Sequence, residues 1–95
     1  MTVLWRERSG PGRVAFAVGR RVGGAVERNR GRRRMREAFR RQANGMPEGV
    51  DVVLIGRGEV LSRPFPALVE DVATLLRAIR ETVGQRRGRG REARP

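Results

Sequence analysis

The chain has 95 residues, enough for one domain with a small core. It carries 22 basic and 10 acidic residues, a formal net charge of +12, and every basic residue is an arginine. Because cysteine and histidine are absent, the chain offers no disulfide, no thiolate metal site and no imidazole base. The sequence contains neither a membrane-spanning apolar run nor the apolar core of a signal peptide, which predicts a cytoplasmic protein.

The positive charge is concentrated in two segments. Residues 19–41 hold ten arginines and two glutamates, and residues 84–95 hold five arginines and one glutamate, whereas the remainder of the chain is balanced. A neutral body with one basic segment and one basic tail is typical of a protein that binds a polyanion. The tail has almost no apolar residue, so we predict that residues 84–95 are disordered and that residues 1–83 form the folded domain.

Two strand-like segments open the chain. Residues 1–7 (MTVLWRE) are rich in strand formers, and residues 13–19 (RVAFAVG) alternate bulky apolar side chains with small ones. The intervening RSGPGR contains two glycines and a proline and predicts a turn. The short link favours antiparallel pairing of these two strands.

The basic segment predicts a helix that begins near Ala25. Its apolar positions Met35, Ala38 and Phe39 share one face and lie in the second half of the helix. A glycine in mid-helix, Gly31, costs about 1 kcal/mol relative to alanine. We therefore predict a helix that is docked by its last two turns and presents its first half to a partner.

A strand and a second helix complete the predicted fold. Residues 50–57 (VDVVLIGR) form a near-continuous apolar run, typical of the centre of a sheet, and a helix between two strands indicates a crossover with parallel pairing. The last helix is predicted to start near Ser62 as N-cap. Its apolar stripe consists of Phe65, Leu68, Val69, Val72, Leu76, Ile79 and Val83. The predicted class is α+β: a small mixed sheet packed with helices, with a β-α-β crossover that carries the arginine-rich helix.

No arrangement of residues for catalysis is visible in the sequence. The chain has no lysine-containing phosphate loop, and its acids would make a magnesium site only in the loosest sense. Glu70 and Asp71 are better explained as a solvated helix face. We predict no catalytic residue and no metal ligand in this chain, so any enzymatic activity must come from a partner.

The basic segment combines features that bind phosphate. Glycines before the helix allow close backbone approach, and a helix start carries free amide donors with a partial positive charge. Rows of arginines then extend the surface along a nucleic-acid backbone. Asn29 is suited to a base edge or a ribose hydroxyl. The alternative interpretation is a basic face that only contacts solvent.

The segment GRRVGGAVERNRGRRRMREAFR resembles the signature of the protein subunit of bacterial ribonuclease P. That signature has a basic pair, then Arg-Asn-Arg, then further basic residues and an acid-Ala-Phe-Arg end. Arg28, Asn29 and Arg30 match the triplet, and Arg20 and Arg21 stand where the family usually has lysines. RVAFAV, VDVVLIGR and PFPALVEDVATLL resemble the flanking elements, so the resemblance covers most of the chain up to about residue 83.

The resemblance implies a protein that binds a large catalytic RNA. In this family the RNA cleaves precursor tRNA to give the mature 5′ end, with Mg²⁺ at the RNA active site and none bound by the protein alone. The implied fold is ribosomal protein S5 domain 2-like. The implied RNA-binding residues are Arg20, Arg21, Arg28, Asn29, Arg30, Arg32, Arg33 and Arg36.

The family also implies a sheet-lined cleft for the single-stranded 5′ leader of the precursor. Trp5 and Phe16 are the candidates to stack on its bases, although Phe16 beside Val14 and Val18 is equally well explained as a core residue. The family's fold has an N-terminal helix that supplies further aromatics to this cleft. The sequence starts at the first strand, so we expect that helix to be missing and the stability without RNA to be reduced.

Two other functions fit part of the pattern. A small structural RNA-binding protein of the ribosomal type explains the charge and the size, but it does not explain the Arg-Asn-Arg spacing. A DNA-binding protein would place the basic helix in the major groove. No helix-turn-helix precedes the basic segment and no heptad seam follows it, so we do not expect DNA as a partner. The apolar runs are too short to span a membrane, so we expect no membrane partner either.

Overall fold

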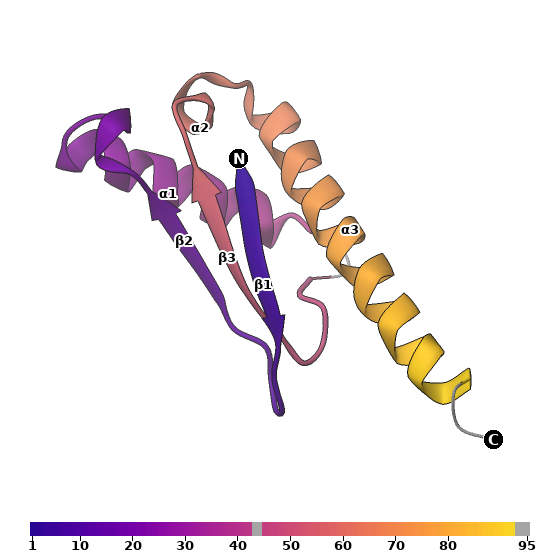
Figure 1. The fold of residues 1–95 in the computed structure, drawn as a ribbon. Helices are drawn as coiled ribbons and strands as arrows, with labels where there is room; N and C mark the ends of the chain where they lie inside the picture. Colours follow the sequence, from indigo (N-terminus) through magenta and orange to yellow (C-terminus); the bar gives the residue numbers. More distant parts are fainter. Residues whose placement is uncertain (43–44, 93–95) are drawn as a thin grey trace.

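The computed structural model describes residues 1–42 and 45–92, with side chains up to Arg86 (Figure 1). Three strands, three helices and one 3-10 turn follow one another in these residues. In chain order they are β1 (Thr2–Glu7), β2 (Val14–Val18), η1 (Arg20–Val22), α1 (Ala25–Arg40), β3 (Val50–Gly56), α2 (Glu59–Ser62) and α3 (Phe65–Glu92). This order confirms the predicted α+β class and the predicted start of the basic helix.

The sheet has the order β1-β3-β2. β1 pairs with β3 in antiparallel fashion, with Thr2 opposite Ile55, and β2 pairs with β3 in parallel fashion, with Val14 opposite Val52. The predicted pairing of the first two strands is therefore wrong, whereas the predicted parallel pairing across the helix is confirmed. β3 is the most apolar strand, and the central place gives its backbone hydrogen-bond partners on both edges.

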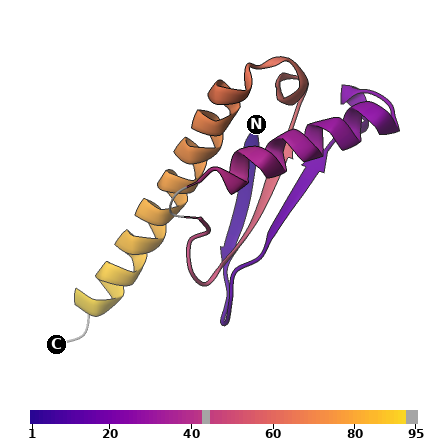
Figure 2. The ribbon, with the colours of Figure 1, turned by 180° about the vertical axis from the view of Figure 1, so that it is seen from behind.

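The β2-α1-β3 crossover is left-handed. Seen from the helix side (Figure 2), the chain runs up β2, passes in front of the sheet as α1 and enters β3 to the left of β2. Parallel β-α-β connections have the opposite hand in about 98% of cases. The start of α1 lies beyond the outer edge of β2, where it projects from the body (Figure 2).

One face of the sheet carries the core, and the other is open. α1 and α3 contact each other on the core side (Figure 2), and the strands direct alternate side chains such as Val52 and Leu54 toward them. The apolar stripe predicted for the last helix is confirmed: five of its members are buried, and Phe65 and Val69 are half-buried. On the open face Leu4 is 58% exposed. The fold is thus two layers with one uncovered side.

Two glycines form a socket for a valine of the short helix α2. The side chain of Val60 is fully buried between Gly31 of α1 and Gly56 at the end of β3. A Cβ atom on Gly31 would lie 3.0 Å from a Val60 methyl carbon, and one on Gly56 would lie 2.6 Å from the other methyl carbon. From the sequence alone, Gly31 is only unfavourable for helix stability. In the structure, its missing side chain leaves the space that Val60 fills.

The last helix differs from the prediction at both ends. Ser62 ends α2 rather than capping α3, because Arg63 adopts an extended conformation between the two helices. At the other end α3 continues through Glu92, whereas a disordered segment was predicted from Gly84. Once the buried part of a helix is formed, each added residue gains a hydrogen bond. Residues 43–44 of the predicted turn and residues 93–95 lie outside the described part.

Candidate nucleic-acid interface

The solvent face of α1 carries one continuous polar stripe. It is made by exposed side chains at spacings of four, three and four residues, which place them on one side of a helix. We call it the arginine stripe; its members are Asn29, Arg33, Arg36 and Arg40. The opposite side of α1 carries Met35 and Ala38, both fully buried. Arg40 belongs to the stripe although the sequence prediction omitted it.

Four of the six predicted RNA-binding residues on α1, all of them arginines, fall into two groups. Arg30 and Arg33 are exposed, and no hydrogen bond or ion pair holds their side chains within the described residues. Arg28 is half-buried and donates to the carbonyl oxygen of Gly23 at 3.3 Å, while Arg32 donates to Asn29. The first group is free to contact a ligand, and the second is partly occupied by contacts inside the protein.

Arg34 has a structural role that the sequence pattern does not reveal. Its guanidinium donates to the carbonyl oxygen of Val60 at 2.9 Å and to that of Arg63 at 2.7 Å. These bonds satisfy backbone carbonyls at the end of α2 and tie that helix to α1. One of the ten arginines in the basic segment is therefore used to hold the fold together.

Replacing Arg34 with alanine should destabilise the protein, whereas replacing its neighbour Arg33 with alanine should not. Loss of two hydrogen bonds from a charged donor, one partly buried and one exposed, costs about 2 kcal/mol. We expect the midpoint of thermal unfolding to fall by roughly 10 °C for a domain of this size. Circular dichroism melts of both variants test this, and equal melting temperatures for the two would contradict it.

The beginning of α1 is organised differently from the expectation. Gly24 caps the helix without a side-chain bond, and the carboxylate of Glu27 folds back toward it, since a Cβ on Gly24 would lie 3.2 Å from Glu27 Oε2. An acid in the first turn interacts favourably with the helix dipole. The backbone amides at the start of α1, which were expected to bind phosphate, therefore have the carboxylate of Glu27 beside them. Val26 is 75% exposed and does not anchor the helix.

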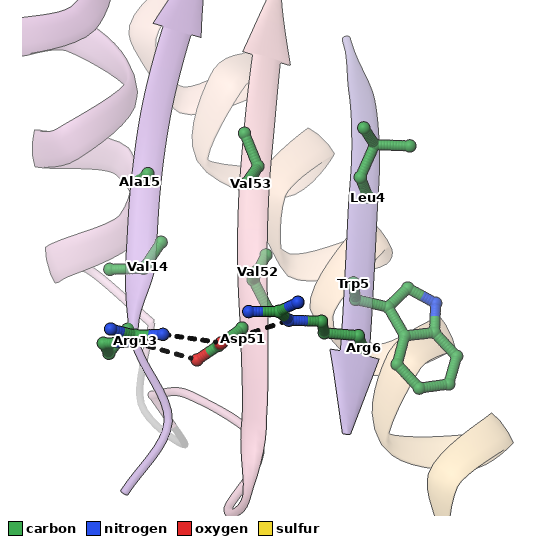
Figure 3. A pocket seen from close by; sticks show the side chains of 9 residues that line it. All are labelled: Leu4, Trp5, Arg6, Arg13, Val14, Ala15, Asp51, Val52 and Val53. Atoms are coloured by element: carbon green, nitrogen blue, oxygen red, sulfur yellow. Dashed lines mark hydrogen bonds and ion pairs between the residues drawn. The ribbon is translucent and has the colours of Figure 1, made fainter. Parts of the chain in front are cut away.

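The two aromatic residues predicted for the leader lie at different places. Phe16 projects toward α1, where its ring meets Phe39 edge-on at 5.8 Å and the guanidinium of Arg36 at 5.6 Å. Trp5 is half-buried at the β1 edge, and Arg86 of α3 lies 5.8 Å from its ring. Phe16 therefore packs beneath the arginine stripe. The side chain of Trp5, opposite the buried Val52, is directed toward α3 and away from the charged row on the open sheet face (Figure 3), so the structure does not bring the two aromatic residues together.

The open sheet face holds a shallow pocket of about 530 Å³ with a charged row across it (Figure 3). Asp51 of β3 lies between Arg6 and Arg8, at the end of β1, and Arg13, which directly precedes β2. Its carboxylate is 3.5 Å from Arg6, 3.4 Å from Arg8 and 3.1 Å from Arg13. Three arginines on one carboxylate leave an excess of positive charge at this end of the face, above an apolar floor that includes Leu4 and Val53.

The hydrogen bond from Arg13 lowers the pKa of Asp51 to about 2, from an ordinary value of 3.8. Because the pKa is lower in the folded protein, the carboxylate stabilises the fold above pH 4 and loses this effect as the pH falls toward 2. We expect Asp51→Asn to melt below the wild type at pH 6, with the difference vanishing near pH 2. A difference that stays constant between pH 6 and pH 2 would contradict this account.

The described part of the chain has neither a membrane span nor a cluster of metal ligands. Within residues 1–42 and 45–92, no helix is long and apolar enough to cross a membrane. In the same part of the chain, no three acidic side chains are grouped so that they could hold a metal ion.

Comparison with known proteins assigns the chain to a family. The family model described as ribonuclease P matches residues 1–80. The chain belongs to the ribonuclease P protein family. The match includes α1 with its Arg28-Asn29-Arg30 triplet and all three strands, which confirms the resemblance seen in the sequence.

Curated relatives support the same family. The chain is 49% identical over 78 residues to the ribonuclease P protein component of Gluconacetobacter diazotrophicus, which covers 81% of this chain and 67% of the relative. It is 50% identical over 66 residues to that of Chloroflexus aurantiacus, which covers 68% of this chain and 49% of the relative. The chain thus spans between about half and two thirds of these two relatives.

Solved structures of ribonuclease P proteins share the fold. The RNase P protein from Thermotoga maritima has 35% sequence identity and a TM-score of 0.68, over 78% of this chain and 72% of that one. The RNase P protein of Staphylococcus aureus has a TM-score of 0.66 over 81% of this chain and 72% of that one. At 20% identity the second likeness concerns the fold alone.

Proposed function

We propose that this chain is the protein component of a bacterial ribonuclease P. In this role it binds the catalytic RNA and the 5′ leader of precursor tRNA and assists the endonucleolytic removal of that leader. The observation that carries the proposal is the position of the family's Arg-Asn-Arg triplet, which lies on a helix that exposes Asn29, Arg30 and Arg33 to solvent. Precursor tRNA is made in the bacterial cytoplasm, which is where the protein would act.

The two charged surfaces would have separate tasks. α1 is fixed to the core by Met35 and Ala38, so its arginine stripe forms a rigid surface for the phosphates of the catalytic RNA. The open sheet face would receive the single-stranded leader. There Arg6 and Arg13 would contact its phosphates, above the apolar floor that includes Leu4 and Val53.

We assign the cleavage chemistry to the RNA subunit and the magnesium ions that it binds. The chain has no histidine or cysteine to act as base or nucleophile. Acids that could otherwise act as bases have partners in the fold: Asp51 contacts three arginines, and Asp71 accepts from Arg63 at 2.7 Å. The contribution of the protein would be binding, positioning and screening of phosphate repulsion.

Competition binding tests the proposed partner. We expect the chain to bind a bacterial ribonuclease P RNA and to remain bound in the presence of excess random-sequence duplex DNA. Displacement by the DNA would favour a general nucleic-acid binder. Co-sedimentation with ribosomal subunits at high salt, without binding to ribonuclease P RNA, would instead favour a structural ribosomal protein.

A further inference from the structure

A Gly-Arg dipeptide occurs at the end of each of the two parallel strands. β2 is followed by Gly19-Arg20, and β3 ends on Gly56 and is followed by Arg57. The parallel register pairs Val18 with Gly56, so both arginine-bearing turns leave the same edge of the sheet. One turn forms η1 and leads into α1, and the other leads into α2. Figure 1 shows η1 and α2 beyond the arrowheads of the two strands.

A groove of about 790 Å³ lies between these turns. We call it the Gly-Arg groove; it is lined by Gly19, Arg20, Arg21, Val22, Ile55, Gly56, Arg57 and Gly58. No acidic side chain lines it. The adjacent Glu59 is paired with the amino group of Met1. The residues that line the groove therefore contribute three positive charges and no negative one.

Its three arginines are available to a ligand. The side chains of Arg20, Arg21 and Arg57 are all exposed, and within the described residues no hydrogen bond or ion pair holds any of them. The walls also permit close approach, because a Cβ on Gly19 or Gly58 would meet nothing within 4 Å. Three exposed guanidinium groups around a groove with glycine in its walls suit the oxygens of a phosphodiester.

We propose that the Gly-Arg groove binds the sugar-phosphate backbone of the ribonuclease P RNA and that Arg57 is an RNA-binding residue. This inference rests on the proposed function. The inference extends the proposed function, because Arg57 lies in a different part of the chain from the Arg-Asn-Arg helix. Arg20 and Arg21 precede α1 by a few residues, so an RNA strand that contacts the arginine stripe can continue into the groove. Two segments 36 residues apart would then hold one strand from both sides.

The test compares Arg57→Gln with Arg77→Gln in the full chain. Arg77 is exposed on α3, on the side of that helix opposite its buried stripe, so both variants lose one charge at a solvent-exposed position. Affinity for a bacterial ribonuclease P RNA is measured across a series of salt concentrations. Loss of one phosphate contact reduces the slope of log affinity against log salt by roughly 0.7–0.9. We expect this reduction for Arg57→Gln, no change for Arg77→Gln, and the wild-type slope for Arg57→Lys.

The possible outcomes separate the two proposals. If the wild type binds the RNA and both glutamine variants have the same slope, the groove proposal is overturned and the proposed function stands. If the wild type does not bind the RNA, the proposed function fails and the groove proposal fails with it. Thermal melts of the variants identify any loss of fold, which is not expected for exposed side chains without partners.

Discussion

Simultaneous replacement of Arg30 and Arg33 by glutamine is expected to weaken binding to ribonuclease P RNA by at least about 100-fold near 0.15 M salt. A charge-assisted hydrogen bond contributes about 1.5–3 kcal/mol, and two such contacts would be lost. Both side chains are exposed and neither is held by a partner within the described residues, so the fold should not change. Equilibrium binding, together with a thermal melt of the variant, measures the two effects separately.

A matched pair of single variants shows whether position or total charge matters. Arg33→Gln and Arg77→Gln each remove one positive charge, the first from the arginine stripe and the second from the outer side of α3. A binding surface on α1 predicts a loss of about tenfold for Arg33→Gln alone. Equal losses for both variants would mean that only the net charge of the protein attracts the RNA.

Gly56→Ala is expected to lower the free energy of unfolding by about 1–3 kcal/mol, although it adds a single methyl group. The new Cβ would lie 2.6 Å from a methyl carbon of Val60 and 2.9 Å from the sulfur of Met35. Val60 is fully buried and cannot move away without disturbing the contact between α2 and α1. For a domain of this size the melting temperature should fall by on the order of 5–20 °C.

A double-mutant cycle with Val60→Ala assigns the cause of that loss. Removing the valine methyl groups opens a cavity, which is destabilising by itself. In that background the alanine at position 56 has room, so Gly56→Ala should cost less than it does in the wild type. Strictly additive effects of Gly56→Ala and Val60→Ala would show that the socket is not the reason for the glycine.

Helices and strands that depend on residues close together in the sequence could be predicted from the spacing of apolar side chains. The alternation in residues 13–19, the apolar run of residues 50–57 and the stripe of α3 each follow from a single period along the chain. The start of α1 at Ala25 follows from the glycines before it. The family resemblance then identified the arginine triplet, which no periodicity could single out among ten arginines.

Features that depend on distant residues were not predictable in this way. The short link between β1 and β2 favoured a hairpin, but β3 lies between them because it gains from two neighbours. Gly31 is unfavourable in an isolated helix, but here Val60, 29 residues further along the chain, fills the space beside it. The different roles of Arg33 and Arg34 likewise depend on where α2 ends.

The most direct measurement is cleavage of precursor tRNA by a bacterial ribonuclease P RNA at low magnesium, with and without this chain. The RNA alone should work poorly there, because few cations screen the repulsion between its phosphates and those of the substrate. The account predicts that the chain restores cleavage at the mature 5′ end and that Arg30→Gln/Arg33→Gln does not. Binding of the RNA without restored cleavage at any protein concentration would contradict it.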